Sequence, residues 1–212
     1  MNSGQSCRRN SVRARVRLYL ASSNPGKLAE FQALAADGGV AAEIDLALVP
    51  SFAELPEFEE NAPTFGENAL GKALHYSRFC SGLVLTDDSG LVVPALGGAP
   101  GVHSARYAGP GASSEQKIAK LLVEMRGLRG EERTAYFVCV IAAVREGSGV
   151  AVVSERVDGE ILEMPRGRGG FGYDPVFYVA ELEKTLAEIS EAEKNRVSHR
   201  GKAFRRLLAT LR

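Results

Sequence analysis

The stretch Gly82-Leu-Val-Leu-Thr-Asp-Asp-Ser-Gly90 runs from apolar residues directly into two adjacent carboxylates, Asp87 and Asp88. A short apolar run of this kind is typical of a buried strand, and α/β proteins place ligand sites where such strands end. Neighbouring side chains of an extended chain point to opposite faces, so we expect Asp87 and Asp88 to have different roles. One can face a cleft and hold a metal ion or a water molecule, while the other orients backbone or a basic group. The alternative is a polar turn that binds nothing.

Strands and helices alternate along the rest of the chain, separated by turn residues. A Ser followed three residues later by Gln or Glu predicts that helices start after Ser113 and after Ser190. The predicted strands are 16–20, 44–49, 82–86, 133–144, 150–153 and 176–179, and the predicted helices are 28–35, 65–79, 114–126 and a C-terminal one through 204–211. This interleaving, with one antiparallel hairpin, indicates an α/β fold in which helices flank a mixed β-sheet.

The composition excludes several classes of protein. The 212 residues fit one domain, and 26 Lys and Arg balance 26 Asp and Glu, which argues against a nucleic-acid surface that works by bulk charge. No apolar stretch approaches the roughly 20 residues that span a bilayer. We interpret residues 1–14 as a disordered basic arm before a single domain of residues 15–212. Cys7, Cys80 and Cys139 form neither a metal-spaced pair nor a disulfide framework, which favours a reducing cytoplasm.

A first candidate binding segment is Ser22-Ser-Asn-Pro-Gly-Lys27, a turn between a predicted strand and a predicted helix. Small residues let backbone N–H groups approach a ligand, the helix N-terminus attracts anions, and Lys27 adds a full positive charge. The segment suits a polyphosphate, although it is not a P-loop because Leu28 follows Lys27 where Ser or Thr is needed. The alternative is an ordinary turn with a surface lysine.

A second candidate is the acidic loop that carries Glu57, Glu59 and Glu60, considered together with Asp88. Magnesium prefers hard oxygen ligands, usually one or two carboxylates with water and substrate phosphates. For each of these glutamates alone, a solvated acidic loop is the competing interpretation.

A third candidate is the glycine-rich segment Gly169-Gly-Phe-Gly-Tyr-Asp174. Phe171 and Tyr173 offer faces on which a base can stack, and Asp174 can accept hydrogen bonds from a ring N–H. A fourth candidate lies near the start of the predicted C-terminal helix. Three hydrogen-bond donors that suit keto oxygens or phosphates occur there within a short span: Lys194, His199 and Arg200. The alternatives are a bulged strand entry with core aromatics and a structural histidine.

Six motifs occur in the same order as in the inosine/xanthosine triphosphate pyrophosphatases, or HAM1-like family, which the chain therefore resembles over nearly its whole length. They are SSNPGK (22–27), ENA with KA (67–73), TDDSGL (86–91), GGAPGVHSARY (97–107), GGFGYDPVF (169–177) and EK…SHRG (193–201). The resemblance implies Mg²⁺-dependent hydrolysis of ITP, dITP and XTP to the monophosphate and pyrophosphate. It also implies a homodimer, with a long mixed sheet and two lobes around a central cleft.

The resemblance implies roles for individual residues. Asp88 would accept a proton and bind the metal, and Glu60 is the favoured second metal ligand among the acidic-loop glutamates. Substrate contacts would come from Ser22, Ser23, Asn24, Pro25, Gly26, Lys27, Ser89, Phe171, Gly172, Tyr173, Asp174, Lys194, His199 and Arg200. Two competing functions remain open: a related pyrophosphatase that acts on modified pyrimidines or other triphosphates, and a nucleotide-binding regulatory module without catalysis.

Overall fold

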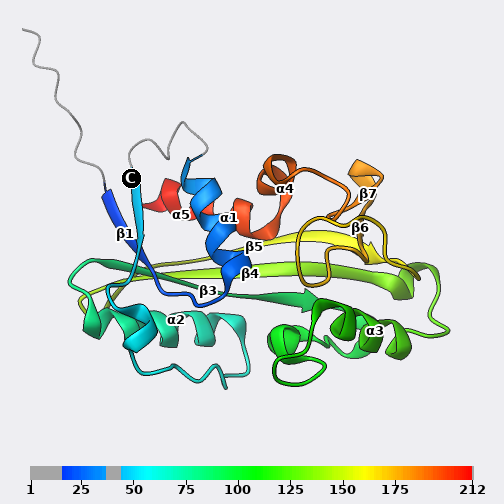
Figure 1. The fold of residues 1–212 in the computed structure, drawn as a ribbon, viewed down its shortest axis with the longest axis horizontal. Coiled ribbons are helices and arrows are strands. Elements are labelled where there is room, and N and C mark those ends of the chain that lie inside the picture. The colour runs from blue at the N-terminus through cyan, green and yellow to red at the C-terminus, as the bar shows by residue number, and fades with distance from the viewer. Residues whose placement is uncertain (1–15, 37–43, 212) are drawn as a thin grey trace, which may run out of the picture.

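The computed structural model describes residues 16–36 and 44–211. Within these residues the chain forms one seven-stranded mixed sheet in the order β2-β1-β3-β4-β5-β6-β7 (Figure 1). The strands are β1 (Val16–Leu20), β2 (Ile44–Leu48), β3 (Leu83–Val92), β4 (Thr134–Arg145), β5 (Ser148–Ile161), β6 (Phe177–Val179) and β7 (Lys184–Thr185). β1 is parallel to β2 and β3, whereas the neighbours from β3 to β7 are antiparallel. The predicted α/β class with a mixed sheet is confirmed, and the predicted arm at 1–14 lies outside the described residues.

Helices cover both faces of the sheet. In Figure 1, α1 (Pro25–Ala36), α4 (Glu191–Val197) and α5 (His199–Thr210) lie above it, and α2 (Phe65–Tyr76) and α3 (Ser114–Glu124) lie below it. On the upper face Phe31 packs edge-on against Phe204, with ring centroids 5.5 Å apart, over buried side chains of β1, β3 and β4. On the lower face α2 packs its alanines on Val140, Ala142 and Val144 of β4. A separate apolar cluster joins α3 to β6 and the far end of the sheet, so the sheet supports two lobes.

Local sequence explains where several elements begin. The predicted capping boxes are both present, with Ser113 starting α3 and Ser190 starting α4. The hairpin between β4 and β5 turns on Glu146 and Gly147, whose φ angles are both positive, as a two-residue turn between twisted strands requires. β5 is much longer than predicted, because the link uses only these two residues and because β5 pairs with β4 as far as Glu160. No helix among residues 16–36 and 44–211 is long and apolar enough to span a membrane.

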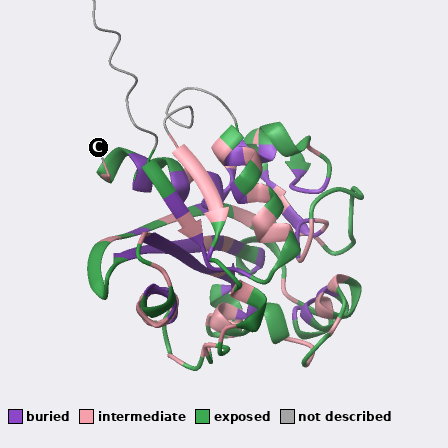
Figure 2. Ribbon diagram, turned by 60° about the vertical axis from the view of Figure 1, so that its left-hand side comes forward, coloured by how far each residue is buried: buried purple, intermediate pink, exposed green. Residues whose placement is uncertain are grey.

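The position of the two carboxylates within β3 differs from the prediction. β3 does not end before Asp87 but continues to Val92, because every residue from Leu83 to Val92 pairs with β4. The strand that ends here is the parallel neighbour β1, whose pairing with β3 stops at Leu85. The carboxylates therefore lie in mid-strand, just beyond the carboxyl end of β1. Figure 2 shows the strongly buried centre of the sheet, and both aspartates belong to it, with exposed fractions of 0% and 4%.

Candidate active site

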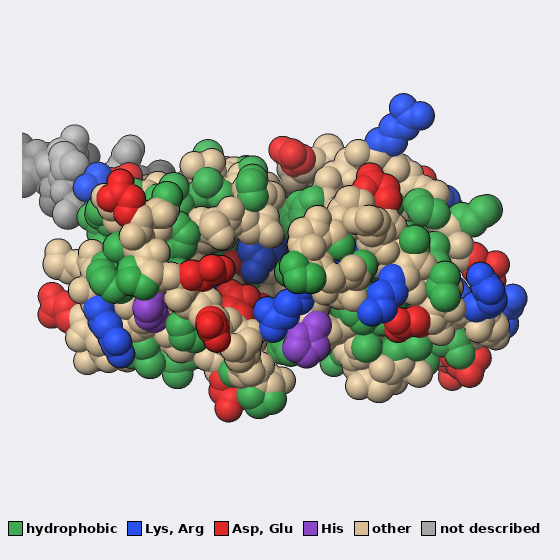
Figure 3. Space-filling model, turned by 60° about the horizontal axis from the view of Figure 1, so that its bottom comes forward, with side chains coloured by type: hydrophobic (Ala, Val, Ile, Leu, Met, Phe, Trp, Pro, Cys, Tyr) green, Lys and Arg blue, Asp and Glu red, His purple; other side chains and the backbone are tan. Residues whose placement is uncertain are grey.

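Two adjoining cavities form a cleft between the lobes. The larger one, of about 440 Å³, is called here the acidic cavity and is lined by Glu57, Glu59, Glu60, Asp88, Ser22 and Lys72 among others. The smaller one, of about 160 Å³, is the aromatic cavity, lined by Phe137, Phe171, Tyr173, Lys194, His199 and Arg200 among others. Both are lined by Asn24, Lys27, Ser89 and Ala105, which therefore form the waist of the cleft. Figure 3 shows the hollow between the two lobes, with acidic side chains on one side of it and basic side chains within and beside it.

Asp87 points to the upper face of the sheet and pairs with two cations through Oδ2, whereas its buried Oδ1 has no hydrogen-bond partner among residues 16–36 and 44–211. Its Oδ2 lies 3.0 Å from Lys27 Nζ and 3.4 Å from Arg200 Nε. It also accepts a hydrogen bond from Ser89 Oγ at 3.2 Å. Burial by itself would raise the pKa of Asp87, but the attraction of Lys27 and Arg200 outweighs it and holds the pKa well below its ordinary range. Asp87 is therefore an anion that anchors two cations.

Asp88 points to the opposite face, towards α2. Its Oδ2 accepts from Asn68 Nδ2 at 3.0 Å, and its Oδ1 accepts from the backbone N–H of Ser89 at 2.9 Å. Burial raises the pKa of Asp88 to about 6; Lys27 opposes this rise, and the negative charge of Glu60 adds to it. A carboxylate with a pKa near neutrality can take up a proton at physiological pH, as a general base must. The predicted orientation of the two neighbours towards opposite faces is confirmed.

Glu30 is a site residue that the sequence analysis missed. It lies on α1 and forms an ion pair with Arg200, and its Oε1 lies 3.3 Å from Lys194 Nζ. Arg200 also donates to Ser89 Oγ at 2.8 Å, so its guanidinium is held on three sides. The signal that could have found Glu30 is its spacing three residues after Lys27, which places both on one face of a helix.

The glycine-rich loop at 169–174 is held by Asp174. This buried carboxylate accepts from the N–H of Phe171 at 2.8 Å and pairs with Lys194 Nζ at 2.6 Å. Gly170 and Gly172 both have positive φ, which lets the loop turn tightly enough for these contacts. Phe171 is partly buried and lies over Gly26, at which a Cβ would come within 3.0 Å of its ring. The predicted stacking residue Phe171 therefore lines the cavity.

Tyr173 has a different environment from Phe171. It is 3% exposed, belongs to the apolar cluster of the second lobe and donates from its hydroxyl to the Ser104 carbonyl at 3.0 Å. Its ring lies at the edge of the aromatic cavity and has no face free for a base to stack on.

His199 also lines the aromatic cavity and stacks on Phe137, with centroids 4.8 Å apart and planes 9° from parallel. Burial and the neighbouring cations lower the pKa of His199 well below its ordinary value, so the imidazole is neutral.

The predicted anion-binding turn is already capped by its own side chain. The N–H groups of Gly26 and Lys27 donate to Asn24 Oδ1 at 3.0 and 3.2 Å, which makes Asn24 the N-cap of α1. Pro25 occupies the first helical position, where its missing N–H costs nothing. Pro25 and Gly26 line neither cavity of the cleft, in contrast to Asn24, Lys27 and Ser22. The turn therefore offers side chains to a ligand, and its two N–H groups become available only if Asn24 moves.

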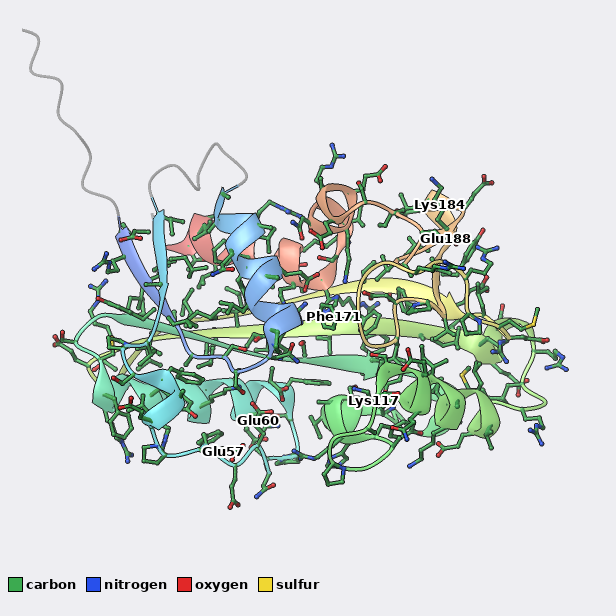
Figure 4. All side chains as sticks on the ribbon, in the orientation of Figure 1. Glu57, Glu60, Lys117, Phe171, Lys184 and Glu188 are labelled. Atoms are coloured by element: carbon green, nitrogen blue, oxygen red, sulfur yellow. The ribbon has the colours of Figure 1, made fainter. Side chains whose placement is uncertain are left out.

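The acidic cavity suits a divalent cation. Asp88 and Glu60 line it together, and the repulsion between them that raises the pKa of Asp88 is what a bound cation would relieve. Among residues 16–36 and 44–211 no three His, Cys, Asp or Glu side chains gather as a complete metal cage. Two carboxylates with open positions fit Mg²⁺, which keeps waters and takes substrate phosphates. Figure 4 shows Glu57 and Glu60 on the loop that precedes α2, and Glu60 also pairs with Lys72 at 2.6 Å.

Comparison with known proteins agrees with this fold. The chain is 50% identical over 190 residues to the dITP/XTP pyrophosphatase of Geobacillus kaustophilus, covering 90% of this chain and 91% of that protein. It is 50% identical over 204 residues to the dITP/XTP pyrophosphatase of Acidobacterium capsulatum, covering 92% and 97%. The solved structure of a HAM1 protein from Coxiella burnetii superimposes with a TM-score of 0.81 at 41% identity, covering 92% of this chain and 98% of that one. Residues 18–210 match the model of the Ham1 family, and the chain belongs to that family.

Proposed function

We propose that the protein hydrolyses non-canonical purine nucleoside triphosphates, namely dITP, ITP and XTP, to the nucleoside monophosphate and pyrophosphate. The observation that carries the proposal is the pair of carboxylates on β3, of which Asp88 alone opens into the acidic cavity with a pKa near neutrality. The names of the relatives in Geobacillus kaustophilus and Acidobacterium capsulatum support the same activity. The family resemblance, together with the cleft geometry, favours a catalytic enzyme over a nucleotide-binding module.

Each of the two cavities would hold a different part of the substrate. The base would occupy the aromatic cavity against Phe171, and the phosphates would run past Lys27 into the acidic cavity. Stacking on an aromatic ring stabilises a base by about 1–3 kcal/mol. Lys27 pairs with Asp87 and would interact with the phosphate nearest the waist. Ser22, Ser23 and Asn24 provide further polar groups for the phosphates from the same side.

Asp88 would act on the attacking water. Its carboxylate is fixed by Asn68 and by the Ser89 N–H, and one face remains open to the cavity. A fixed carboxylate can orient a water molecule toward the α-phosphorus and accept its proton as the bond to pyrophosphate breaks. Asp88 and Glu60 would hold Mg²⁺, which when bound neutralises charge on the phosphates and on the departing pyrophosphate. The neutralisation also keeps Asp88 ionised in the loaded enzyme.

Selection for keto purines would follow from a cavity rich in donors. The guanidinium of Arg200 and the ammonium of Lys194 line it, and donors pair with a 6-keto oxygen but not with the 6-amino group of adenine. Of the carboxylates paired with these cations only Asp174 lines the cavity, and it is engaged by Lys194 and by the N–H of Phe171. The 2-amino group of guanine would therefore find its acceptors occupied, whereas the 2-keto oxygen of xanthine is an acceptor itself.

A substrate panel tests the proposed function. ITP, dITP, XTP, GTP and dUTP are compared with and without Mg²⁺, with detection of pyrophosphate rather than orthophosphate. We expect Mg²⁺-dependent pyrophosphate release from the first three at kcat/KM well above the other two. Preferential turnover of dUTP would instead indicate the related pyrophosphatase for other triphosphates, and binding without turnover would indicate the regulatory module.

The role of Asp88 is tested by Asp88→Asn. Loss of a general base costs about 10²–10⁴-fold in rate, so kcat for ITP should fall by that factor while ITP binding is kept. Turnover within a few-fold of the unaltered protein would refute the assigned role.

The proposed assembly is a homodimer, as the family resemblance implies. Large apolar side chains on the surface, such as Val150 and Val152 of β5 with exposed fractions of 46% and 51%, are available for a contact between copies. Light scattering coupled to size exclusion should give twice the 22.7 kDa mass of one chain. A mass of one chain at micromolar concentration would contradict the dimer.

A further inference from the structure

Three cations line the inner side of the aromatic cavity, and their positive charges are matched by carboxylates. Each of them is paired with a carboxylate: Lys27 with Asp87, Lys194 with Asp174, and Arg200 with Glu30. These three cations and three carboxylates cancel, so the inner cluster is neutral as a whole. An uncompensated cation nearby would add a charge-assisted hydrogen bond to the phosphates of a nucleotide.

Lys117 is such a cation and comes from the other side of the cleft. It lies on α3 and lines the aromatic cavity, yet its Nζ makes only a long hydrogen bond, 3.4 Å, to the carbonyl of Ala105. Within residues 16–36 and 44–211, no carboxylate oxygen lies within 4.0 Å of this ammonium. Its side chain is partly buried. Figure 4 shows Lys117 on the α3 side of the sheet and Phe171 on the other side.

The position of Lys117 along the cleft is set by its partner Ala105. Ala105 lines both cavities, together with Asn24, Lys27 and Ser89. The ammonium of Lys117 therefore lies beside one residue of the waist, where the aromatic cavity meets the acidic one. Lys27 lines the same waist from α1, so the two lysines approach it from separate lobes.

The helix that carries Lys117 is firmly held. The capping box at Ser113 fixes the start of α3, and Ser114 Oγ accepts from the backbone N–H of Gly172 at 3.1 Å. Ile118 and Leu121 are buried in the second-lobe cluster. Lys117 thus has a fixed backbone and a weakly bonded head group, which lets it change partner from Ala105 to a ligand at little cost.

We propose that Lys117 binds the α-phosphate of the substrate, opposite Lys27, so that both lobes hold the nucleotide at its waist. The proposal rests on the proposed function, because that function places the base in one cavity and the outer phosphates in the other. The phosphate between them is the one at the waist. A charge-assisted hydrogen bond from the second lobe would add affinity for any ligand that has this phosphate.

The test compares ligands that differ only in phosphates. Binding of inosine, IMP and ITP to the full chain is measured by calorimetry in EDTA, which prevents turnover, for the unaltered protein, Lys117→Ala and Lys117→Arg. We expect Lys117→Ala to bind both IMP and ITP about tenfold more weakly, the ratio that corresponds to ~1.4 kcal/mol, and inosine unchanged. Lys117→Arg should recover most of the affinity, because it keeps the charge.

Lys120→Ala is the matched control. Lys120 lies one turn further along α3 and donates to the Tyr107 carbonyl at 2.8 Å, outside both cavities, so its loss should change no affinity. Equal weakening of inosine would overturn the proposal by assigning Lys117 to the base, and weakening of ITP alone would assign it to the outer phosphates. Unchanged binding of all three would make Lys117 a solvated lysine. Pyrophosphate release by the unaltered protein is measured alongside: its absence would refute the proposed function, whereas the ligand series reports on Lys117 by itself.

Discussion

The two faces of β3 give the adjacent side chains Asp87 and Asp88, which are chemically identical, opposite environments. On the upper face Asp87 lies among Lys27, Arg200 and Ser89, and every charge has a partner. On the lower face Asp88 lies beside Asn68 and across from Glu60, with a cavity in front of it. Burial acts on both, but cations outweigh it for Asp87 and not for Asp88.

The opposite pKa shifts of Asp87 and Asp88 have opposite effects on the stability of the folded protein. The ionised Asp87 stabilises the folded state, because its pKa is lowered there. The ionised Asp88 costs stability, because its pKa is raised to about 6 from an ordinary 3.8. Proteins tolerate such a cost where a site needs a reactive group. Neighbouring positions on one strand thus allow a stable charge cluster to hold a destabilised carboxylate in place.

Asp87→Asn should have the largest effect on stability. It leaves the buried Arg200 and the partly buried Lys27 without their shared carboxylate, and breaking a buried ion pair from one side costs about 3–5 kcal/mol. Urea unfolding at pH 7.5 measures the loss of unfolding free energy. The control is Asp45→Asn, which removes the exposed partner of Arg17 and should cost less than ~1 kcal/mol. Equal effects of the two variants would contradict the stabilising role of Asp87.

Asp88→Asn should change stability in the opposite direction. In EDTA at pH 7.5 the variant should be more stable by roughly 1–2 kcal/mol, because it removes the cost of ionising Asp88 but forfeits one of its accepted hydrogen bonds. The cost exists only where Asp88 is charged in the unfolded chain, so it is absent below about pH 4 and complete above about pH 6. The gain should therefore shrink when the pH is lowered from 7.5 to 5. A destabilised variant at pH 7.5 would show that the raised pKa of Asp88 is not a stability cost.

Glu60→Gln should lower the pKa of Asp88. The negative charge of Glu60 is one of the causes that raise this pKa, and the amide removes it without changing the size of the side chain. Carboxyl carbon NMR of the protein in EDTA should place the titration of Asp88 below the value of about 6 in the unaltered protein. Glu57→Gln, in the same cavity, serves as the control and should shift it less. No shift in the Glu60 variant would mean that the two carboxylates do not interact.

Asn68→Ala should raise the pKa of Asp88, by less than Glu60→Gln lowers it. The Asn68 amide donates to the charged form of Asp88, so its loss disfavours that form and raises the pKa. The acidic limb of the pH–rate profile at low Mg²⁺ should shift upward with it. A downward shift would show that the hydrogen bond does not stabilise the carboxylate.

The sequence by itself determined the class of the fold and most of its elements. The capping boxes at Ser113 and Ser190 start helices where predicted, because capping depends on residues three positions apart. Strand alternation separated Asp87 from Asp88, because the period of two is a property of any extended chain. The order of six motifs was sufficient to indicate the Ham1 family.

The tertiary structure alone decided which of the two carboxylates has its pKa raised and which has it lowered. The continuation of β3 to Val92 depends on pairing with β4, which lies about 50 residues later in the chain. Glu30 meets Arg200 across 170 positions, and Lys117 of α3 contacts the carbonyl of Ala105, which lines both cavities. A pKa depends on burial and on every charge nearby, and these are set by segments distant in the chain. Local pattern therefore specifies elements, whereas the electrostatics of the site exist only once those elements are packed.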